Sequence, residues 1–126
     1  MIDAPCTGTG AWRRNPDAKW RLRPNALAMR VAEQDAVLRE GAALVKPGGR
    51  LVYITCSVLP DENEGRLAAF RSAYPSFAPI SAAEAAVAAN LPALSGHAAA
   101  SGNGVLLTPR TAGTDGFFIA VMRRTA

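Results

Sequence analysis

The sequence predicts a small α/β fold whose sheet is partly parallel. Apolar runs alternate with helical patterns along the first part of the chain, and two further apolar runs close it. A strand–helix–strand–helix order is typical of a parallel sheet covered by helices, whereas two apolar runs joined by a turn are typical of a hairpin. At 126 residues, the chain is long enough for one domain or for part of a larger one.

The chain opens on a predicted strand end at residues 1–6. A turn rich in Thr and Gly follows at residues 7–10, and a basic loop interrupted by prolines fills residues 11–24. Because little strand precedes this turn and large apolar side chains are few, we expect residues 1–126 to be a fragment of a larger domain. The alternative is a small complete domain with a ragged first element.

Residues 25–46 carry apolar side chains at helical spacing, which predicts a helix with one buried face. The apolar residues of that face are Leu27, Val31, Leu38, Ala42 and Val45. The helix is expected to stop at the Pro-Gly-Gly sequence of residues 47–49. The nearly continuous apolar run at residues 50–55 then predicts a strand buried on both faces of the sheet.

A second helix is predicted to start at Pro60, with acidic residues in its first turn, and to end before Pro75. Its apolar side carries Leu67, Phe70 and Ala73. Residues 75–104 are rich in Ala, Ser and Gly, and we expect a variable surface loop there, with a helical stretch only at residues 82–91.

The chain closes on a predicted hairpin. Its strands are the apolar runs at residues 105–108 and 117–122, and the turn-rich residues 109–116 join them. The last strand is therefore expected to run antiparallel to its neighbour.

The composition excludes several classes of protein. The net charge of +4 and the sequence pI near 9.7 exclude an acidic disordered tail. With no run of 18 apolar residues and no signal-peptide pattern at the start, we expect neither a membrane span nor secretion. Two cysteines are too few for a disulfide scaffold, and a reduced, cytoplasmic setting is the simplest interpretation.

The excess positive charge lies entirely in the first fifty residues. Five cations fall between Arg13 and Arg23, close to Trp12 and Trp20. Cations interleaved with aromatic rings suit the phosphates and stacked bases of a nucleic acid. A solvated loop whose arginines pair with nearby acids explains the same composition.

Two cysteines follow predicted strands, Cys6 after the first and Cys56 after the second. Ligands of open α/β sheets bind at the carboxyl ends of the strands, so both thiols are expected at one functional edge, facing a single site if their strands are neighbours. The alternative is that each is a small buried hydrophobic residue. Asp3 is a candidate for proton transfer or for binding a cationic group, and it can equally cap a turn.

No metal site is expected. The only histidine, His97, lies in the variable segment with no ligand spacing around it, and two cysteines alone do not make a zinc site. The turn that contains Gly8 and Gly10 matches neither of the common nucleotide-binding loops.

Three segments of the sequence resemble motifs of the NOL/NOP/Sun family of RNA cytosine carbon-5 methyltransferases. DAPCTGTG at residues 3–10, with RRNPDAKW at residues 13–20, is similar to the family's fourth motif. KPGGRLVYITCS at residues 46–57, with ENE at residues 62–64, resembles the sixth motif and its flank. TDGFFIA at residues 114–120 resembles the closing strand, so the matches stand in the family's order and cover most of the chain.

The resemblance implies a partial Rossmann-like fold of an S-adenosylmethionine-dependent methyltransferase, namely the C-terminal half of its sheet with the last strand antiparallel. It implies that Cys56 is the nucleophile and that Cys6 assists release of the product. It also implies that Asp3 and Pro5 lie beside the methyl donor, with Asp3 near the target base. Carbon 5 of cytosine is a poor nucleophile, and addition of a thiolate to carbon 6 activates it. A helix starting just after Cys56 is expected to favour that thiolate.

The partner implied by the resemblance is RNA, and ribosomal RNA is the family's commonest substrate class. This moves the interpretation of the basic cluster towards RNA contact, with Arg13, Arg14 and Lys19 as the phosphate-binding residues. The family's first motif, a Gly-rich loop that grips the methyl donor, is not in this chain, so we expect the isolated chain to bind S-adenosylmethionine weakly and to have no turnover. The alternatives are a basic RNA-binding module without catalysis and a truncated product with no role of its own.

Overall fold

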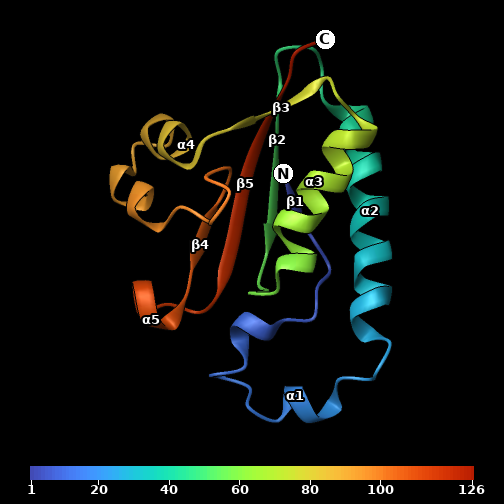
Figure 1. Ribbon diagram of the computed structural model, residues 1–126, viewed down its shortest axis with the longest axis vertical. Helices are drawn as coiled ribbons and strands as arrows, with labels where there is room; N and C mark the ends of the chain where they lie inside the picture. Colours follow the sequence, from blue (N-terminus) through green and yellow to red (C-terminus); the bar gives the residue numbers. More distant parts are fainter.

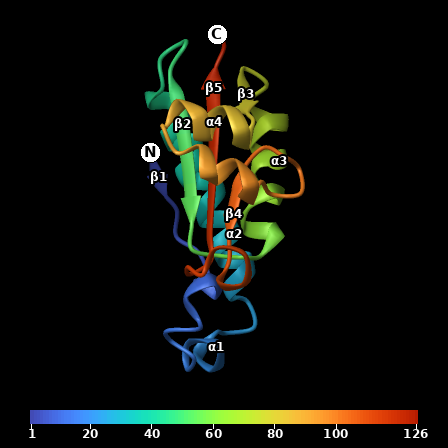
Figure 2. The same cartoon turned by 90° about the vertical axis from the view of Figure 1, so that its left-hand side faces the viewer.

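The computed structural model describes residues 1–126 and shows a mixed five-stranded sheet with helices on both faces (Figure 1). Helices α2 (Ala26–Leu44) and α3 (Glu64–Ala73) cover one face of the sheet. The shorter helix α4 (Ala82–Ala88) lies over the opposite face (Figure 2). The predicted α/β fold is confirmed.

Two of the strands are parallel, and the remaining pairings are antiparallel. The order is β1 (Ile2–Asp3), β2 (Arg50–Thr55), β5 (Phe117–Arg124) and β3 (Phe77–Ile80), and β4 (Val105–Leu107) also pairs with β5. Strand β1 runs parallel to β2, whereas β5 runs antiparallel to each of its three neighbours. The expected antiparallel last strand is therefore confirmed. Strand β5 lies in the middle of the sheet and connects β1 and β2 on one side with β3 and β4 on the other.

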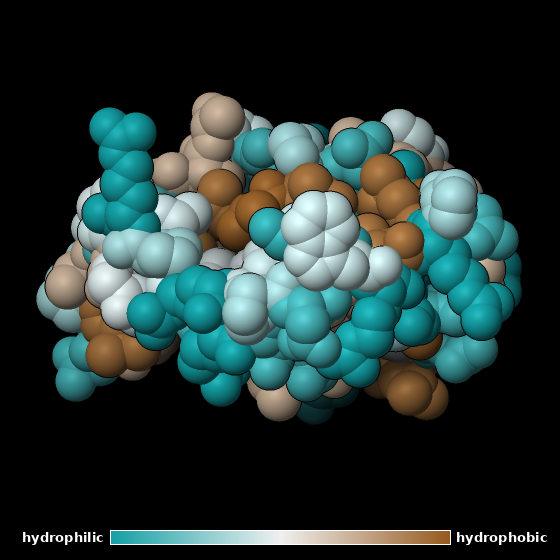
Figure 3. Space-filling view, turned by 90° about the horizontal axis from the view of Figure 1, so that it is seen from below, coloured by the Kyte–Doolittle hydropathy of each residue, from teal (hydrophilic) through white to brown (hydrophobic).

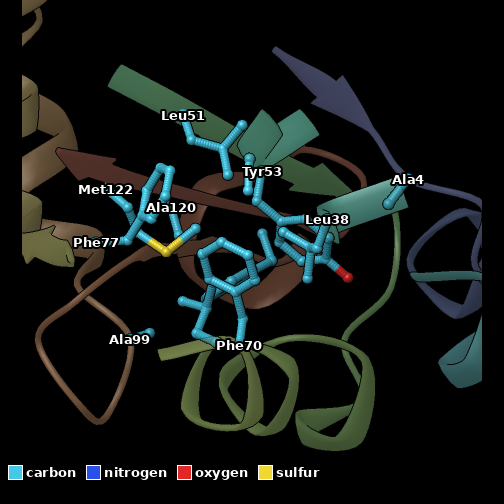
Figure 4. Close-up of a cluster of buried hydrophobic side chains, with 12 residues drawn as sticks. Ala4, Leu38, Leu51, Tyr53, Phe70, Phe77, Ala99, Ala120 and Met122 are labelled. Atoms are coloured by element: carbon cyan, nitrogen blue, oxygen red, sulfur yellow. The ribbon is translucent and has the colours of Figure 1, made fainter. Parts of the chain in front are cut away.

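The core lies between the sheet and the two long helices. Figure 4 shows Leu51 and Tyr53 of β2 and Met122 of β5 facing Leu38 of α2 and Phe70 of α3, all of them buried. The expectation that β2 is buried on both faces is wrong, because burial along this strand alternates and its other face is only half-buried beneath α4. No helix is both long enough and apolar enough to cross a membrane.

Helix α2 matches the helix predicted at residues 25–46 to within two residues at each end. Leu38 and Ala42 are buried on the predicted face. The apolar pattern did not predict that Gln34 lies on this face and is fully buried. Within the basic loop, residues 9–11 form a 3-10 turn, and α1 (Ala18–Arg21) is a single helical turn.

The predicted second helix begins later than Pro60. Pro60–Glu62 form a 3-10 turn, and α3 starts at Glu64. Leu67 and Phe70 are buried as predicted, but Ala73, the last residue of the helix, is exposed. The helix therefore does not begin directly after Cys56.

The expectation of a loop over residues 75–104 is wrong for part of that segment. Phe77 begins strand β3, which pairs with the last residues of β5, and its ring packs edge-on against Phe70 at 5.3 Å between centroids. Helix α4 follows, capped by the Ser81 hydroxyl, which accepts from the Glu84 amide. A 3-10 helix at Pro92–His97 completes the segment. The closing hairpin of β4 and β5 is confirmed, with α5 (Pro109–Ala112) in its connection.

Gly10, in the turn after β1, contacts the backbone of two remote segments, at Cys56 and at Gly116. Its N–H donates to the Cys56 carbonyl at 2.9 Å, and the Gly116 N–H donates to the Gly10 carbonyl at 2.8 Å. A Cβ atom at Gly10 would lie 2.3 Å from the Gly116 carbonyl oxygen and 2.7 Å from the Cys56 carbonyl oxygen. These are backbone atoms held by hydrogen bonds, so no side chain fits at position 10.

We predict that Gly10→Ala lowers the free energy of unfolding by about 2–3 kcal/mol, the cost of overpacking a tight contact. Urea unfolding of residues 1–126, followed by circular dichroism, measures this loss. The matched control is Gly96→Ala, because no atom lies within 4 Å of a Cβ at that position and the unfolding free energy should change by less than about 0.5 kcal/mol. Equal unfolding midpoints for the two variants would contradict the prediction.

Candidate active site

The two cysteine thiols meet at the carboxyl ends of β1 and β2. The parallel register places Asp3 opposite Ile54, and both strands end at the same edge of the sheet. The Cys6 and Cys56 sulfur atoms lie 3.4 Å apart, which is hydrogen-bond contact and far longer than an S–S bond of about 2.05 Å. The prediction that both thiols lie together at one edge of the sheet is confirmed, and their shared function stays a prediction. Both residues are half-buried, so neither is a core hydrophobic residue.

The environment of Cys6 favours its protonated form. Burial is the largest cause, the hydrogen bond with Cys56 is the next, and together they raise the pKa of the Cys6 thiol to about 12. At neutral pH, Cys6 is therefore a thiol that can donate its proton towards the Cys56 sulfur.

Hydrogen bonds join the turn after β1 to the segment after β2. The Thr9 hydroxyl lies 3.1 Å from the Ser57 hydroxyl and accepts from the Val58 amide at 3.0 Å. On the other side of the turn, both the amide and the hydroxyl of Thr7 donate to Glu62, at 2.8 and 2.6 Å. These contacts are made by the residues that follow Cys6 in the sequence, and they hold its turn against the Cys56 segment.

Glu62 is fully buried, and nothing in its local sequence predicts a role of its own for it. Besides its two bonds from Thr7, its carboxylate accepts from the Gln34 side-chain amide at 3.1 Å. The same Gln34 nitrogen donates to the Pro5 carbonyl at 2.8 Å. A glutamine on the otherwise apolar face of α2 is the sequence signal that could have revealed this network.

A second set of buried polar groups supports the segment from Ser57 to Asn63. Tyr53 donates its hydroxyl to the Glu62 carbonyl at 2.7 Å, and burial raises the pKa of this phenol, which keeps it a donor. Thr55 donates to the Asn63 side chain at 2.5 Å, and that side chain donates to the Ser57 carbonyl at 2.8 Å. The Cys56 side of the site is thereby fixed to the sheet.

Asp3 and Pro5 occupy different environments. Asp3 is exposed on β1, and its side chain makes no hydrogen bond or ion pair within the chain. Strand alternation points its side chain away from α2, to the face opposite the buried Ala4. Pro5 is half-buried and is held through its carbonyl by Gln34. The structure thus brings Cys6 and Cys56 into contact and leaves the Asp3 carboxylate without a partner.

The arginines of the basic cluster are partly neutralised. Arg13 and Arg14 both bind Asp115, with Nε–Oδ distances of 2.8 and 2.5 Å, and the hydrogen bond from Arg13 is the largest cause that lowers the pKa of this carboxyl. Lys19 is exposed and lies over the ring of Trp20, with its Nζ 4.8 Å from the centroid. Asp115 therefore ties the basic loop to the closing hairpin.

A cleft of about 360 Å³ opens beside Cys6 at the lower end of the molecule. Figure 3 shows the molecule from this end, and its surface there is largely hydrophilic with apolar patches. The walls of the cleft come from the turn after β1, the basic loop and the start of α2. The lining residues are Cys6, Thr7, Arg21, Leu22, Arg23, Asn25, Ala26, Met29 and Arg30. Arg21 and Arg30 pair with Asp17 and Glu33, whereas Arg23 has no ion-pair partner.

A second cavity, of about 350 Å³, lies between α4 and the sheet and contains neither thiol. Its lining is mostly Ala, Val, Ile and Leu, so it offers no chemistry comparable to that of the cysteine pair.

Comparison with known proteins assigns the chain to a family. Residues 1–123 match the family described as 16S rRNA methyltransferase RsmB/F. The chain is 39% identical over 124 residues to the ribosomal RNA small subunit methyltransferase B of Thermus thermophilus and 40% identical over 124 residues to the probable enzyme of that name in Bacillus subtilis. In both cases 98% of the chain is matched, but it spans only about a quarter of these relatives' length, 28% and 27%.

Solved structures share the fold of this chain. The crystal structure of PH0851 superposes with a TM-score of 0.79 at 32% identity, and the match covers 96% of this chain and 25% of that one. NSun6 from Pyrococcus horikoshii, solved with SFG, superposes with a TM-score of 0.70 at 22% identity over 99% of this chain and 29% of its own, a likeness of fold. The chain therefore belongs to the RsmB/F family of 16S rRNA methyltransferases, within the Sun group that its motifs resemble.

Proposed function

We propose that the complete gene product containing this chain methylates carbon 5 of a cytosine in RNA, with ribosomal RNA as the substrate class, and that Cys56 is its nucleophile. The observation that carries the proposal is the 3.4 Å contact between two free thiols at the ends of parallel strands, in a chain of an rRNA methyltransferase family. A thiol pair beside a basic cleft suits covalent chemistry on a nucleic-acid base.

The chemistry follows from the electron demand of the pyrimidine ring. The Cys56 thiolate adds to carbon 6, and the carbon 5–carbon 6 electron pair becomes available at carbon 5, which accepts a methyl group. A base then removes the proton from carbon 5. The electrons of that C–H bond restore the ring double bond, and the C–S bond breaks to return the Cys56 thiolate. The target base must be unpaired or flipped out to reach the thiol.

Cys6 is placed to serve the second half of this reaction. Before attack, the two sulfur atoms are in hydrogen-bond contact, and the Cys6 thiol is the donor when Cys56 is a thiolate. Once Cys56 is bonded to carbon 6 it can no longer carry a negative charge, so two causes that raise the pKa of Cys6 disappear, namely the hydrogen bond and the charge of Cys56. Burial still raises the pKa of Cys6, so its thiol passes its proton to solvent first, and the resulting thiolate then accepts the carbon 5 proton, which releases the product.

S-adenosylmethionine, when bound, supplies the methyl group as part of a sulfonium cation. The exposed carboxylate of Asp3 on β1 has no partner within the chain and therefore suits a cation. We propose that Asp3 and Pro5 form this chain's part of the site for the methyl donor. The family's glycine-rich donor loop is not among the 126 residues. We therefore expect isolated residues 1–126 to show no micromolar binding of S-adenosylmethionine in calorimetry.

The RNA strand is proposed to follow the basic loop into the cleft beside Cys6. Arg13, Arg14 and Lys19 are the proposed phosphate contacts, and Arg23 adds an unpaired cation inside the cleft. The alternative, a basic RNA-binding module without catalysis, uses the same surface and does not need the thiols.

The first prediction concerns the covalent step. With RNA containing 5-fluorocytosine at the target position, the complete gene product should form an adduct that survives denaturing electrophoresis, because fluorine at carbon 5 blocks proton removal. Cys56→Ser should abolish the adduct, whereas Cys6→Ser should still form it. With unmodified RNA, Cys6→Ser should accumulate adduct at least about tenfold above the native protein, because the release step loses its base.

An RNA-binding module would instead bind this RNA without any adduct in the native protein. That outcome, with S-adenosylmethionine present and binding confirmed by filter retention, would exclude the proposed mechanism.

The second prediction uses the pH dependence of the thiols. Cys56→Ala removes two causes that raise the pKa of Cys6, so the Cys6 thiolate should form at lower pH and Cys6 should be alkylated faster than in the native protein at any pH below about 12. Iodoacetamide labelling of residues 1–126 between pH 7 and 11, quantified by mass spectrometry of the Cys6 peptide, compares the two rates. A rate that stays the same or falls in Cys56→Ala would show that Cys56 does not control the protonation of Cys6.

The third prediction concerns RNA contact. Arg13→Ala/Arg14→Ala should weaken binding of residues 1–126 to single-stranded RNA and reduce the slope of log K against log salt by about one, because Asp115 already offsets one of the two charges. Fluorescence anisotropy at several salt concentrations gives the slope. The control Arg39→Ala/Arg71→Ala removes two exposed cations from α2 and α3 and should leave the slope unchanged. Equal slopes for both variants would contradict phosphate contact.

A further inference from the structure

The buried carboxylate of Glu62 lies against the residue that follows Cys6, and no step proposed so far uses it. We infer that Glu62 is a positioning residue, which holds Cys6 in place for the release of the methylated product. The inference rests on the function proposed above and adds a residue that acts on one half of the reaction.

Both oxygens of the Glu62 carboxylate are committed to one neighbour. Oε1 accepts from the Thr7 amide at 2.8 Å, and Oε2 accepts from the Thr7 hydroxyl at 2.6 Å. Two bonds to one residue fix the position and the rotation of that residue, and Cys6 is joined to it directly. A carboxylate only accepts hydrogen bonds, and all three groups around this one are donors.

The burial of Glu62 is costly for a residue that only fills space. Its side chain is fully buried, and none of the six ion pairs in the chain includes it. An apolar residue of similar volume commonly stabilises such a position at least as well as a buried charge. The Gln34 side chain, which also contacts Glu62, leaves its own buried oxygen without a partner. Two polar side chains are thus kept in the interior directly beneath the Cys6 turn.

The hydrogen bonds between Glu62 and Thr7 restrain the position of Cys6 more than that of Cys56. Cys56 directly follows β2, which is hydrogen-bonded along its whole length to β5, and its carbonyl is bound by Gly10. Cys6 lies three residues beyond β1, which has only two residues and one neighbouring strand. Loss of the Glu62–Thr7 contacts should therefore displace the Cys6 sulfur while the Cys56 sulfur stays in place. In the proposed reaction, attack and methyl transfer would continue and release would slow.

The test compares Glu62→Met with the native form of the complete gene product. Methionine keeps the volume and removes all three hydrogen bonds. With target RNA and S-adenosylmethionine, the variant should transfer methyl groups in a single turnover within about threefold of the native rate. Covalent RNA adduct should accumulate roughly tenfold, the loss expected from charge-assisted hydrogen bonds, towards the level of Cys6→Ser.

Three further variants separate positioning from simple loss of stability. Glu62→Gln should restore release to within about threefold of the native rate, because the amide oxygen can keep the bonds from the Thr7 amide and Gln34 while its NH₂ donates to the Thr7 hydroxyl. Thr7→Val removes only the hydroxyl bond and should raise the adduct by about threefold even if Glu62→Met unfolds. Asp61→Asn removes a neighbouring exposed charge with no side-chain partner and should leave both readouts unchanged.

Two outcomes would overturn the inference. In the first, the rate of methyl transfer and the amount of covalent adduct fall together in both Glu62→Met and Thr7→Val. In the second, both variants release the product at the native rate. Failure of the proposed function would differ from either, because the native protein itself would then form no adduct with 5-fluorocytosine RNA.

Discussion

The site depends on the parallel pairing of β1 with β2. This register ends both strands at one edge of the sheet and leaves their two cysteines in contact, although fifty residues separate them along the chain. A shift by one residue would turn every side chain of β1 to the other face, so Ala4 could no longer lie in the core and Cys6 could no longer reach Cys56. Packing of Ile2 and Ala4 under α2 therefore fixes the chemistry at the strand ends as well as the fold.

The interior of the molecule is divided between apolar packing and polar contacts. Next to the cysteines, the buried residues are Gln34, Thr55, Ser57, Glu62 and Asn63, whereas the middle of the sheet is packed with aliphatic and aromatic side chains. A buried polar network has few alternative arrangements, because each displaced donor or acceptor loses its partner. The segment carrying Cys56 is thereby given one conformation, at some cost in stability.

The sequence alone predicted those features that depend on local patterns. The strand at residues 50–55 has its predicted bounds, and the meeting of the two thiols followed from the rule for strand ends. Strand β3 was missed because it is short and contains Pro79, which is unusual in a strand, and it is ordered by pairing with β5. Arg13 is bound to Asp115, 102 residues away, and no local pattern reveals such a contact. Glu62 was likewise missed, because acidic residues near a helix start are ordinary until their burial is known.

Gly10 touches both the carbonyl of Cys56 and the backbone of Gly116, so three remote stretches of polypeptide converge on one point. Contacts of such long sequence separation form slowly, because closing the intervening loops costs conformational entropy. The turn that follows Cys6 consequently gains its full set of contacts only when the end of the polypeptide has docked against it. In a nascent or partly unfolded molecule, the two cysteines would be separate thiols. Their hydrogen-bond contact would therefore indicate that this part of the chain has folded.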